Sequence, residues 1–290
     1  MKINILEPIG WCSGVAHAVQ TLQKIITKHK KQKIYLVGWL VHNQFIMDSV
    51  QKQGVVVLDD LNKTRLELLT KIKDPQIVIV LSTHGTPQDA LDYTNTHFKQ
   101  FYDLTCTNLL NNFNMIRRLI KQGYRIIYYG TNGHPETQTV MSFSPYIQLI
   151  ESPADAQKIK WDATKKYALV NQSTFSELLV EQVKDVLLKN NSNLHYVNTT
   201  CKAMRIRYEY IHKLKDADLL IIIGDQRSNN VKQLVDFAKH YQINTKLITS
   251  VADVEPSIFQ NINNLVIASG TSIHPECTQA IIKKIKTIAK

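Results

Sequence analysis

Short apolar runs alternate with longer amphipathic runs along the whole chain. The short runs are rich in β-branched residues, and several are apolar throughout, as strands covered on both faces should be. Each is followed by a polar loop and then by apolar positions at helical spacing. This alternation predicts an α/β protein with parallel sheets. We expect nine strand segments, within residues 4–10, 33–40, 77–83, 101–105, 125–130, 167–172, 195–200, 219–224 and 265–270.

Three cysteines divide the chain into thirds. Cys12, Cys106 and Cys201 are 94 and 95 positions apart, and each follows a predicted strand and opens a predicted helix. Such a period is too long for a solenoid and fits three α/β domains of one ancestry. We predict these domains at residues 1–97, 98–193 and 194–290, packed together, because no Gly/Ser/Pro linker separates them.

The other predicted strands also end in polar residues. Ligands of open parallel sheets bind beyond the carboxyl ends of the strands, where the next helix offers N–H groups and its positive end. If the three domains direct these ends toward a common centre, one cavity collects them. Short hydroxyl and amide side chains there serve equally as helix caps or as phosphate ligands. The polar residues that follow the predicted strands, besides the three cysteines, are His42, His84, His134, Ser173, Thr174, Ser228, Asn229, Asn230 and Ser272.

Composition places the chain among ordinary globular proteins, with 44% apolar and 20% charged residues. No apolar run approaches the roughly 20 residues that span a bilayer, so no membrane association is expected. The N-terminus, MKINILEPIGW, lacks the regions of a signal peptide. We therefore expect a cytoplasmic protein, in which four widely spaced cysteines bind metal or take part in catalysis rather than form a disulfide framework.

The net charge of +11 favours anionic partners, such as phosphorylated metabolites or an acidic protein. Zinc-finger spacing and an RNA-binding aromatic signature are both absent from the sequence, so nucleic acid is not expected. The sequence also lacks G-x-x-x-x-G-K-[ST] and G-x-G-x-x-G, which argues against a P-loop NTPase and against a nicotinamide-binding Rossmann protein.

Three equivalent thiols indicate a metal site. Helix N-termini favour the thiolate form of cysteine. Three thiolates and a histidine can hold a structural zinc, but such sites usually take two ligands from a short C-x-x-C run, which this chain lacks. Three single thiolates on separate domains would instead leave one corner of an iron–sulfur cluster open to substrate. Cys277 has no counterpart in the other thirds, and we expect it to be a small buried residue.

The densest local motif is G-x-x-G-H-P-E, from Gly130 to Glu136. A carboxyl group buried at this strand end would have a raised pKa and could deliver a proton. His134 stands beside it in the motif. Together with His42 and His84 it would give cationic or hydrogen-bonding groups for an oxyanion ligand.

The ordered set of motifs resembles the LytB/IspH family of 4-hydroxy-3-methylbut-2-enyl diphosphate reductases. Any one of the motifs is short, but together they cover essentially the whole chain. The matching motifs are G-W-C-S-G-V (10–15), V-H-N (41–43), S-T-H-G (82–85), D-L-T-C (103–106), G-H-P-E (133–136), N-Q-S-T (171–174), the run that opens at Cys201, and S-G-T-S (269–272).

The resemblance implies a trefoil of three α/β domains with pseudo-threefold symmetry around one central [4Fe–4S] cluster. It implies reductive dehydroxylation of 4-hydroxy-3-methylbut-2-enyl diphosphate to isopentenyl and dimethylallyl diphosphate, the last step of the methylerythritol phosphate route to isoprenoids. A ferredoxin or flavodoxin would supply the electrons, and the chain would act as a monomer or homodimer. Carried over residue by residue, the resemblance implies Cys12, Cys106 and Cys201 as cluster ligands; His42, His84, His134, Ser173, Ser228, Asn229, Asn230 and Ser272 as substrate-binding residues; and Glu136, His134 and Ser173 as catalytic residues, with Glu136 the proton source.

Departures from the family pattern leave alternatives open. Thr107 follows Cys106 where a proline is usual, and Met204 replaces a polar residue. The loop 224–230 reads G-D-Q-R-S-N-N instead of G-S-K-N-S-S-N, so Arg227 could pair with phosphate or the loop could fit another anion. The alternatives are a divergent cluster enzyme acting on another phosphorylated hydroxylated substrate and a non-catalytic metal-binding or redox-sensing protein.

Overall fold

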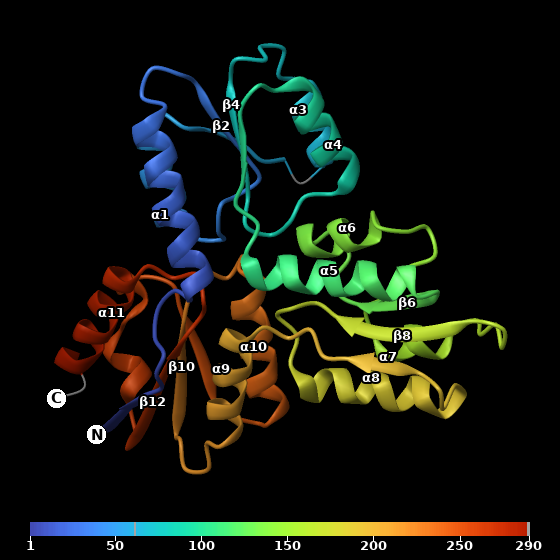
Figure 1. Ribbon diagram of the computed structural model, residues 1–290. Helices are drawn as coiled ribbons and strands as arrows, with labels where there is room; N and C mark the ends of the chain where they lie inside the picture. Colours follow the sequence, from blue (N-terminus) through green and yellow to red (C-terminus); the bar gives the residue numbers. More distant parts are fainter. Residues whose placement is uncertain (61, 289–290) are drawn as a thin grey trace. The chain divides into compact units, whose positions relative to one another are not determined.

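The computed structural model describes residues 1–60 and 62–288 and shows three four-stranded sheets (Figure 1). Every strand pair in them is parallel. The fold class predicted from the sequence, three similar α/β units with parallel sheets, is therefore confirmed. Residues 289–290, at the end of the third predicted domain, lie outside the described residues.

The described residues form twelve strands: β1 (Lys2–Ile5), β2 (Ile34–Val37), β3 (Val56–Leu58), β4 (Val78–Leu81), β5 (Phe101–Asp103), β6 (Tyr124–Tyr129), β7 (Gln148–Ile150), β8 (Lys166–Asn171), β9 (His195–Val197), β10 (Leu219–Ile223), β11 (Thr245–Ile248) and β12 (Asn264–Ser269). The α-helices are α1 (Ser13–Lys28), α2 (Gln44–Lys52), α3 (Arg65–Thr70), α4 (Gln88–His97), α5 (Thr107–Lys121), α6 (Pro135–Met141), α7 (Pro153–Gln157), α8 (Glu177–Asn190), α9 (Lys202–His212), α10 (Asn229–His240) and α11 (Pro275–Ile288), and two 3₁₀ helices span Val251–Asp253 and Pro256–Phe259.

All nine strand segments expected from the sequence overlap a strand of the structure, and three further strands were not expected. These are β3, β7 and β11, which each have three or four residues and lie at a sheet edge. Most of their residues are partly or fully exposed. Their apolar runs are therefore too short and too interrupted to stand out in the sequence.

One strand order recurs in all three sheets. The orders are β3-β2-β4-β5, β7-β6-β8-β9 and, read in the same sense, β11-β10-β12-β1. The last strand of each order is the one that precedes a cysteine in the chain. For Cys12 this strand is β1, which pairs with β12 with Lys2 opposite Asn264 and Ile5 opposite Ile267. Each cysteine strand thus belongs to the sheet of the preceding third of the chain, although the expected boundaries at 97/98 and 193/194 separate it from that sheet. Those boundaries remain a prediction.

The chain divides into two compact units. The terminal unit holds residues 1–16, 42–48 and 201–290 and contains the sheet β1-β12-β10-β11. The central unit holds residues 17–41 and 49–200 and contains the other two sheets.

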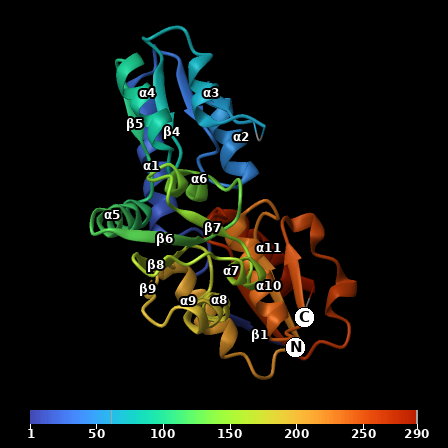
Figure 2. The same cartoon turned by 90° about the vertical axis from the view of Figure 1, so that its right-hand side faces the viewer.

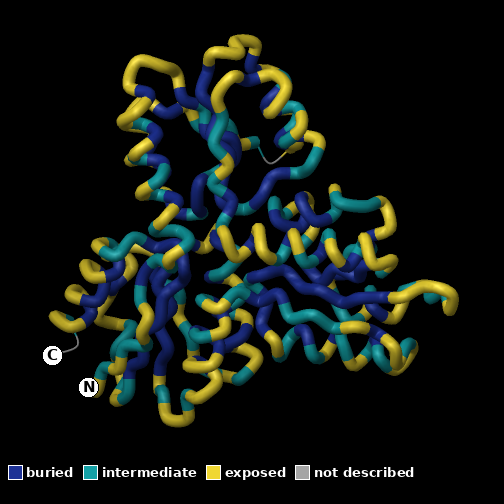
Figure 3. The backbone as a smooth tube through the Cα atoms, in the orientation of Figure 1, coloured by how far each residue is buried: buried dark blue, intermediate teal, exposed yellow. Residues whose placement is uncertain are grey.

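Helices cover both faces of the sheets, which explains their continuous apolar runs. In the central unit, Ile126 of β6 packs in the cluster that includes Phe113 of α5. Its neighbour Ile127 packs on the opposite side, with Val183 of α8. Figure 2 accordingly shows β6 and β8 between α5 and α8. The inner strands of the sheets, β2, β4, β6, β8, β10 and β12, are the most buried segments (Figure 3).

The terminal unit has the same layered construction. Ile221 and Ile267 pack with Ile281 of α11, while α9 and α10 cover the other side of the sheet (Figure 1). On that side the ring of Tyr208 of α9 packs against that of Phe237 of α10, with ring centroids 4.7 Å apart and the ring planes tilted by 50°. This packing fixes the strand ends from which the candidate site residues extend.

Candidate active site

The predicted site residues follow strands in the structure, and they divide between the two units. The terminal unit carries Cys12, His42, Cys201, Ser228, Asn229, Asn230 and Ser272. The central unit carries His84, Cys106, His134, Glu136 and Ser173. Each unit is described separately below.

In the terminal unit the structure brings together Ser228, Asn230 and Ser272. The Asn230 Nδ2 amide donates to Ser228 Oγ at 2.6 Å and lies 3.4 Å from Ser272 Oγ. The two serine hydroxyls are 3.2 Å apart. The Asn230 Oδ1 oxygen accepts from the Thr271 backbone N–H at 2.9 Å, which orients the amide nitrogen toward the serines. The result is a compact group of neutral donors at the N-terminus of α10, a place that favours anions.

The alternative reading of Ser228 as a helix cap does not fit the structure. Ser228 occupies the N-cap position of α10, but its side chain makes no capping hydrogen bond, and it is fully buried. The backbone around it is closely packed, because a Cβ atom on Gly224 or Gly270 would lie 2.4 or 2.5 Å from a Val231 methyl. Glycine at these two positions lets β10 and β12 end directly against the first turn of α10.

Cys12 and Cys201 both stand at helix starts in this unit. Cys12 directly precedes α1, and its backbone N–H donates to the Thr271 carbonyl at 2.9 Å, next to Ser272. Cys201 is the N-cap residue of α9, and its carbonyl accepts from Arg205 N at 3.0 Å. Neither side chain is fully buried. Both cysteines therefore open a helix, as the sequence predicted.

The altered loop after β10 is held by an ion pair. Arg227 Nη2 lies 2.8 Å from Asp225 Oδ2, and Arg227 Nη1 donates to Gln44 Oε1 at 3.0 Å. Burial would raise the pKa of Asp225, but the hydrogen bonds and charge of Arg227 outweigh it and leave this pKa below its usual value. The positive charge of Arg227 is thus engaged with a carboxylate and with the segment that follows His42 and Asn43.

In the central unit Glu136 and Ser173 form a buried pair. Glu136 is 3% exposed. Its Oε1 accepts from the Ser173 backbone N–H at 2.8 Å, and its Oε2 lies 2.7 Å from the Ser173 hydroxyl. Burial raises the pKa of Glu136 to about 7, although hydrogen bonds from Ser173 and Tyr128 oppose the rise. A carboxyl group with such a pKa exchanges a proton readily near neutral pH.

His134 joins this arrangement through the backbone. It is the N-cap residue of α6, where its Nδ1 accepts from the Glu136 N–H at 3.2 Å. Its ring meets the ring of His84 edge-on, with centroids 6.0 Å apart. The loop that carries His84 needs glycine at position 85, where φ is +93° and a Cβ atom would lie 2.9 Å from Phe113 and Thr139.

Cys106 is placed in the central unit as Cys12 is placed in the terminal one. Its backbone N–H donates to the Thr83 carbonyl, beside His84, at 3.0 Å, and it is the N-cap residue of α5. In both units a cysteine N–H is therefore bonded to a carbonyl of a loop that carries a predicted anion ligand. This repeated contact supports the equivalence inferred from the cysteine spacing.

Three further residues that the sequence analysis did not single out support the site. Tyr128 is fully buried and lies with its hydroxyl 3.3 Å from Glu136 Oε1. Asn171 Nδ2 donates to Thr200 Oγ1 at 2.9 Å, which steadies the end of the segment before Cys201. Arg207 is a buried cation on α9. Asn171 belongs to the N-Q-S-T motif and could have been found there, whereas nothing in the sequence distinguishes Tyr128 or Arg207 from packing and surface residues.

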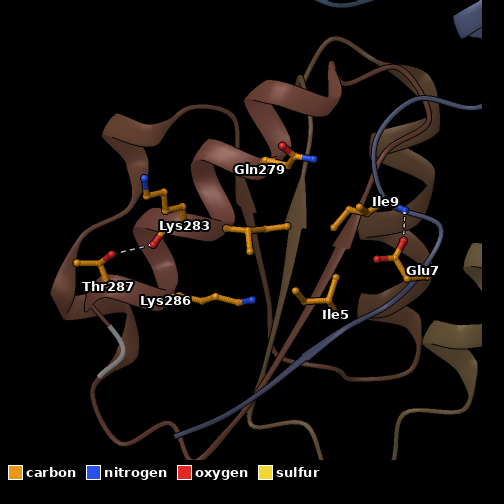
Figure 4. Close-up of a pocket in the computed structure, with 8 residues that line it drawn as sticks. Ile5, Glu7, Ile9, Gln279, Lys283, Lys286 and Thr287 are labelled. Atoms are coloured by element: carbon orange, nitrogen blue, oxygen red, sulfur yellow. Dashed lines mark hydrogen bonds between the residues drawn. The ribbon is translucent and has the colours of Figure 1, made fainter.

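A separate groove of about 580 Å³ lies between β1 and α11 (Figure 4). Isoleucines, among them Ile5 and Ile9, form its floor, and Lys283 and Lys286 stand at its side. It contains none of the residues predicted from the sequence. The candidate chemistry is therefore located at the strand ends and not in this groove.

The cysteines fit an iron–sulfur cluster by the kind of ligand they offer. All four cysteines are among the described residues, and none forms a disulfide. In the described part of the chain, no three His, Cys, Asp or Glu side chains are grouped as ligands of a single metal ion. Three thiols at helix N-termini, one in the central and two in the terminal unit, are nevertheless the donors that such clusters take. Burial raises the pKa of the fourth, Cys277, which packs beside the α11 core.

A buried acid beside a hydroxyl, a group of neutral donors at a helix N-terminus and three cysteines at helix starts, all on parallel α/β sheets, indicate an α/β enzyme. Comparison with known proteins identifies the family: residues 3–286 match the model of the LytB protein family, and the chain belongs to it.

Two relatives and one solved structure show the extent of the likeness. A 4-hydroxy-3-methylbut-2-enyl diphosphate reductase of Malacoplasma penetrans is 33% identical over 277 residues, covering 94% of this chain and 93% of the relative. The reductase of the same name from Symbiobacterium thermophilum is 27% identical over 287 residues, covering 98% of this chain and 96% of the relative. The solved E-1-hydroxy-2-methyl-but-2-enyl-4-diphosphate reductase of Plasmodium falciparum superposes with a TM-score of 0.89 at 23% identity. The superposition covers 98% of this chain and 87% of the solved chain and shows that the fold is shared.

Within the described residues, no helix has the length and apolar character needed to span a membrane.

Proposed function

We propose that this protein is a 4-hydroxy-3-methylbut-2-enyl diphosphate reductase that forms isopentenyl and dimethylallyl diphosphate. The names of its relatives support this activity. The structural observation that carries it is the Glu136–Ser173 pair, a buried acid whose pKa of about 7 suits proton delivery in a reductive dehydroxylation. The overall reaction takes up two electrons and two protons and releases the substrate hydroxyl as water.

The diphosphate would bind at the N-terminus of α10. Ser228, Asn230 and Ser272 offer hydroxyl and amide hydrogens there, within hydrogen-bonding distance of one another. The helix has 12 residues, so its dipole adds to the attraction of a phosphate. We propose Asn229, His42 and His84 as further ligands. Because Arg227 is paired with Asp225, the altered loop still offers neutral donors, which favours the reductase over the alternative of a different anion.

Cys12, Cys106 and Cys201 would hold a [4Fe–4S] cluster, one per chain, in a trefoil arrangement of the three sheets. When bound, such a cluster supplies the electrons for breaking the carbon–oxygen bond. The contribution of the chain is to present three thiolates at helix N-termini, where the backbone N–H of Cys12 and that of Cys106 are each held by a loop carbonyl. The two carbonyls belong to Thr271 and Thr83, so the cysteines are positioned relative to the anion ligands that follow them.

Protons would reach the substrate from Glu136. Two donors, the Ser173 N–H and the Tyr128 hydroxyl, address Oε1, so the acidic proton belongs on Oε2. The Oε2 atom is 2.7 Å from Ser173 Oγ, and the serine hydroxyl can pass the proton onward. His134 accepts the Glu136 N–H and so fixes the first turn of α6, and we propose that its ring also contacts the substrate.

Electrons would come from an acidic ferredoxin or flavodoxin, which suits a chain with a net charge of +11. We propose the cytoplasm as the compartment and a monomer or homodimer as the assembly.

The test is anaerobic reconstitution followed by an assay with the hydroxylated diphosphate and a one-electron donor. We expect about four iron and four sulfide per chain, as a [4Fe–4S] cluster requires, and consumption of the substrate. Glu136→Gln should abolish turnover and leave the iron content unchanged. A colourless protein that binds only zinc would overturn the proposal. An iron-containing protein with no turnover would favour the divergent enzyme, and turnover unaffected by Glu136→Gln would overturn the role of the acid.

A further inference from the structure

Arg207 is a buried cation on α9, six positions after Cys201. It is 4% exposed, and its three guanidinium nitrogens each donate to a different backbone carbonyl. Nε donates to Ser269 O at 2.8 Å, Nη2 to Gly10 O at 2.9 Å and Nη1 to Ala203 O at 2.9 Å. Across residues 1–60 and 62–288, no carboxylate forms an ion pair with it.

The three carbonyls lie in the segments that carry the cysteines of the terminal unit. Gly10 is two residues before Cys12, and Ala203 is two residues after Cys201. Ser269 ends β12, and its hydroxyl accepts the Gly10 N–H at 2.7 Å. Gly10 has φ +79°, a conformation that suits glycine and lets it bond to Ser269 and to Arg207 at once. One guanidinium thus ties together both cysteine segments and the end of a central strand.

The charge of Arg207 is not balanced by its hydrogen bonds. A buried cation that meets only neutral carbonyls retains most of its desolvation cost, so it requires an anion nearby. A cluster bound through Cys12 and Cys201 would supply such an anion, next to the two segments that Arg207 holds through Gly10 and Ala203. Burial lowers the pKa of Arg207, and negative charge at Cys12 and Cys201 would oppose that change.

We infer that Arg207 is a positioning residue of the cluster site: its guanidinium fixes the Cys12 and Cys201 segments, and its charge raises the reduction potential of the cluster that they would hold. The inference rests on the proposed cluster but not on the identity of the substrate. A cation close to a cluster stabilises the reduced form, which carries one more negative charge than the oxidised form. Removing the charge should therefore make the cluster harder to reduce.

The test compares Arg207→Gln and Arg207→Lys with a matched control, Arg205→Gln. Arg205 is exposed on the same helix, so the control removes the same charge from the same element without touching the buried site. Each reconstituted protein is titrated to determine its reduction potential, and its iron content and thermal melting point are measured alongside.

We expect Arg207→Gln to lower the potential and Arg205→Gln to leave it at the wild-type value. Arg207→Lys keeps the charge but cannot reach three carbonyls, so its potential should stay closer to the wild type while its iron content falls. If Arg207→Gln does not fold, the iron content of Arg207→Lys decides the positioning role, because it should fall below that of Arg205→Gln. Potentials in both Arg207 variants equal to that of the control would overturn the inference. Wild-type protein with a cluster but no turnover would contradict the proposed reductase and leave this comparison valid.

Discussion

Glu136 owes its behaviour to two opposing influences at one side chain. Burial disfavours the carboxylate and raises its pKa, while the donors Ser173 and Tyr128 favour the carboxylate and limit the rise. Burial and the adjacent Glu136 charge raise the pKa of Tyr128, so its hydroxyl stays protonated and remains a donor. The balance places the Glu136 pKa near neutrality, where an acid is most useful.

The first prediction concerns the hydroxyl of Tyr128. Tyr128→Phe removes a donor that lowers the pKa of Glu136, so this pKa should rise. Since a general acid works in its protonated form, the alkaline limb of the kcat/KM profile should move to higher pH. The titratable group that the structure places against the Glu136 carboxyl is the Tyr128 hydroxyl, 3.3 Å from Oε1.

The matched control is Tyr129→Phe, because Tyr129 is the next residue of β6 and packs on the opposite side of the sheet, against Phe175. Its profile should coincide with the wild type. An alkaline limb that stays in place in Tyr128→Phe, or moves to lower pH, would count against the assignment of Glu136 as the acid that Tyr128 tunes.

A second prediction links the same carboxyl to stability. The folded state holds the proton of Glu136 up to about pH 7, and the unfolded chain releases it near 4.5. The protonated carboxyl group therefore contributes its full stabilisation of the folded state below pH 4.5, and this stabilisation is lost as the pH rises toward 7. Glu136→Gln resembles the protonated acid, so at pH 8 it should raise the free energy of unfolding relative to wild type by on the order of 3 kcal/mol.

The measurement is denaturant unfolding at pH 5 and pH 8. The free energy of unfolding of Glu136→Gln should exceed that of wild type by a small amount at pH 5 and by a large amount at pH 8. An equal difference at both pH values would mean that Glu136 titrates normally in the folded protein.

At the scale of elements, the anion site depends on how closely α10 approaches the ends of β10 and β12. Gly270 is the sensitive position, because a Cβ atom there would lie 2.5 Å from Val231 Cγ2 and 2.9 Å from Asn230 Oδ1. The first contact displaces the helix, and the second displaces the amide that holds Ser228.

The third prediction is that Gly270→Ala raises KM for the diphosphate about tenfold or more, as expected for the loss of a hydrogen bond to a charged group. Overpacking should also destabilise the protein by about 1–3 kcal/mol. Val231→Ala makes room for the new methyl at the helix but leaves its contact with Asn230 Oδ1, so the double variant should recover stability while KM stays raised. Val231→Ala alone is the control, and a Gly270→Ala enzyme with an unchanged KM would show that Asn230 does not contact the substrate.

The helices and strands were largely predictable from the sequence because their patterns are local. The helices expected to open at Cys12, Cys106 and Cys201 correspond to α1, α5 and α9. The edge strands β3, β7 and β11 could not be predicted from the sequence, since three or four half-exposed residues do not produce a recognisable period of apolar positions.

At the scale of the molecule, the equivalence of the three cysteines leads to the fourth prediction. Cys12→Ser, Cys106→Ser and Cys201→Ser should each reduce the iron bound after reconstitution to a small fraction of the wild-type amount. Each removes one thiolate at a helix N-terminus, and a serine oxygen is a poor ligand for these clusters. Iron and sulfide are determined per chain, with circular dichroism to confirm folding.

Cys277→Ser is the internal control, because Cys277 packs beside the α11 core. This variant should bind iron like the wild type. Full iron content in any one of the other three serine variants would exclude that cysteine as a ligand.

The sequence by itself determined the three parallel sheets, the positions of the cysteines and the polar residues after each strand. These features depend on spacing along the chain, and a spacing of apolar or repeated residues can be read directly. Only the tertiary structure decided that β1 completes the sheet of β10 and β12, that Tyr128 meets Glu136, and that Arg227 pairs with Asp225. It also showed Arg207 buried and bonded to three carbonyls, two of them in the segments that carry Cys12 and Cys201. Which segment pairs with a strand edge, or meets a polar side chain, depends on how distant parts of the chain pack together. The local sequence pattern does not contain that information.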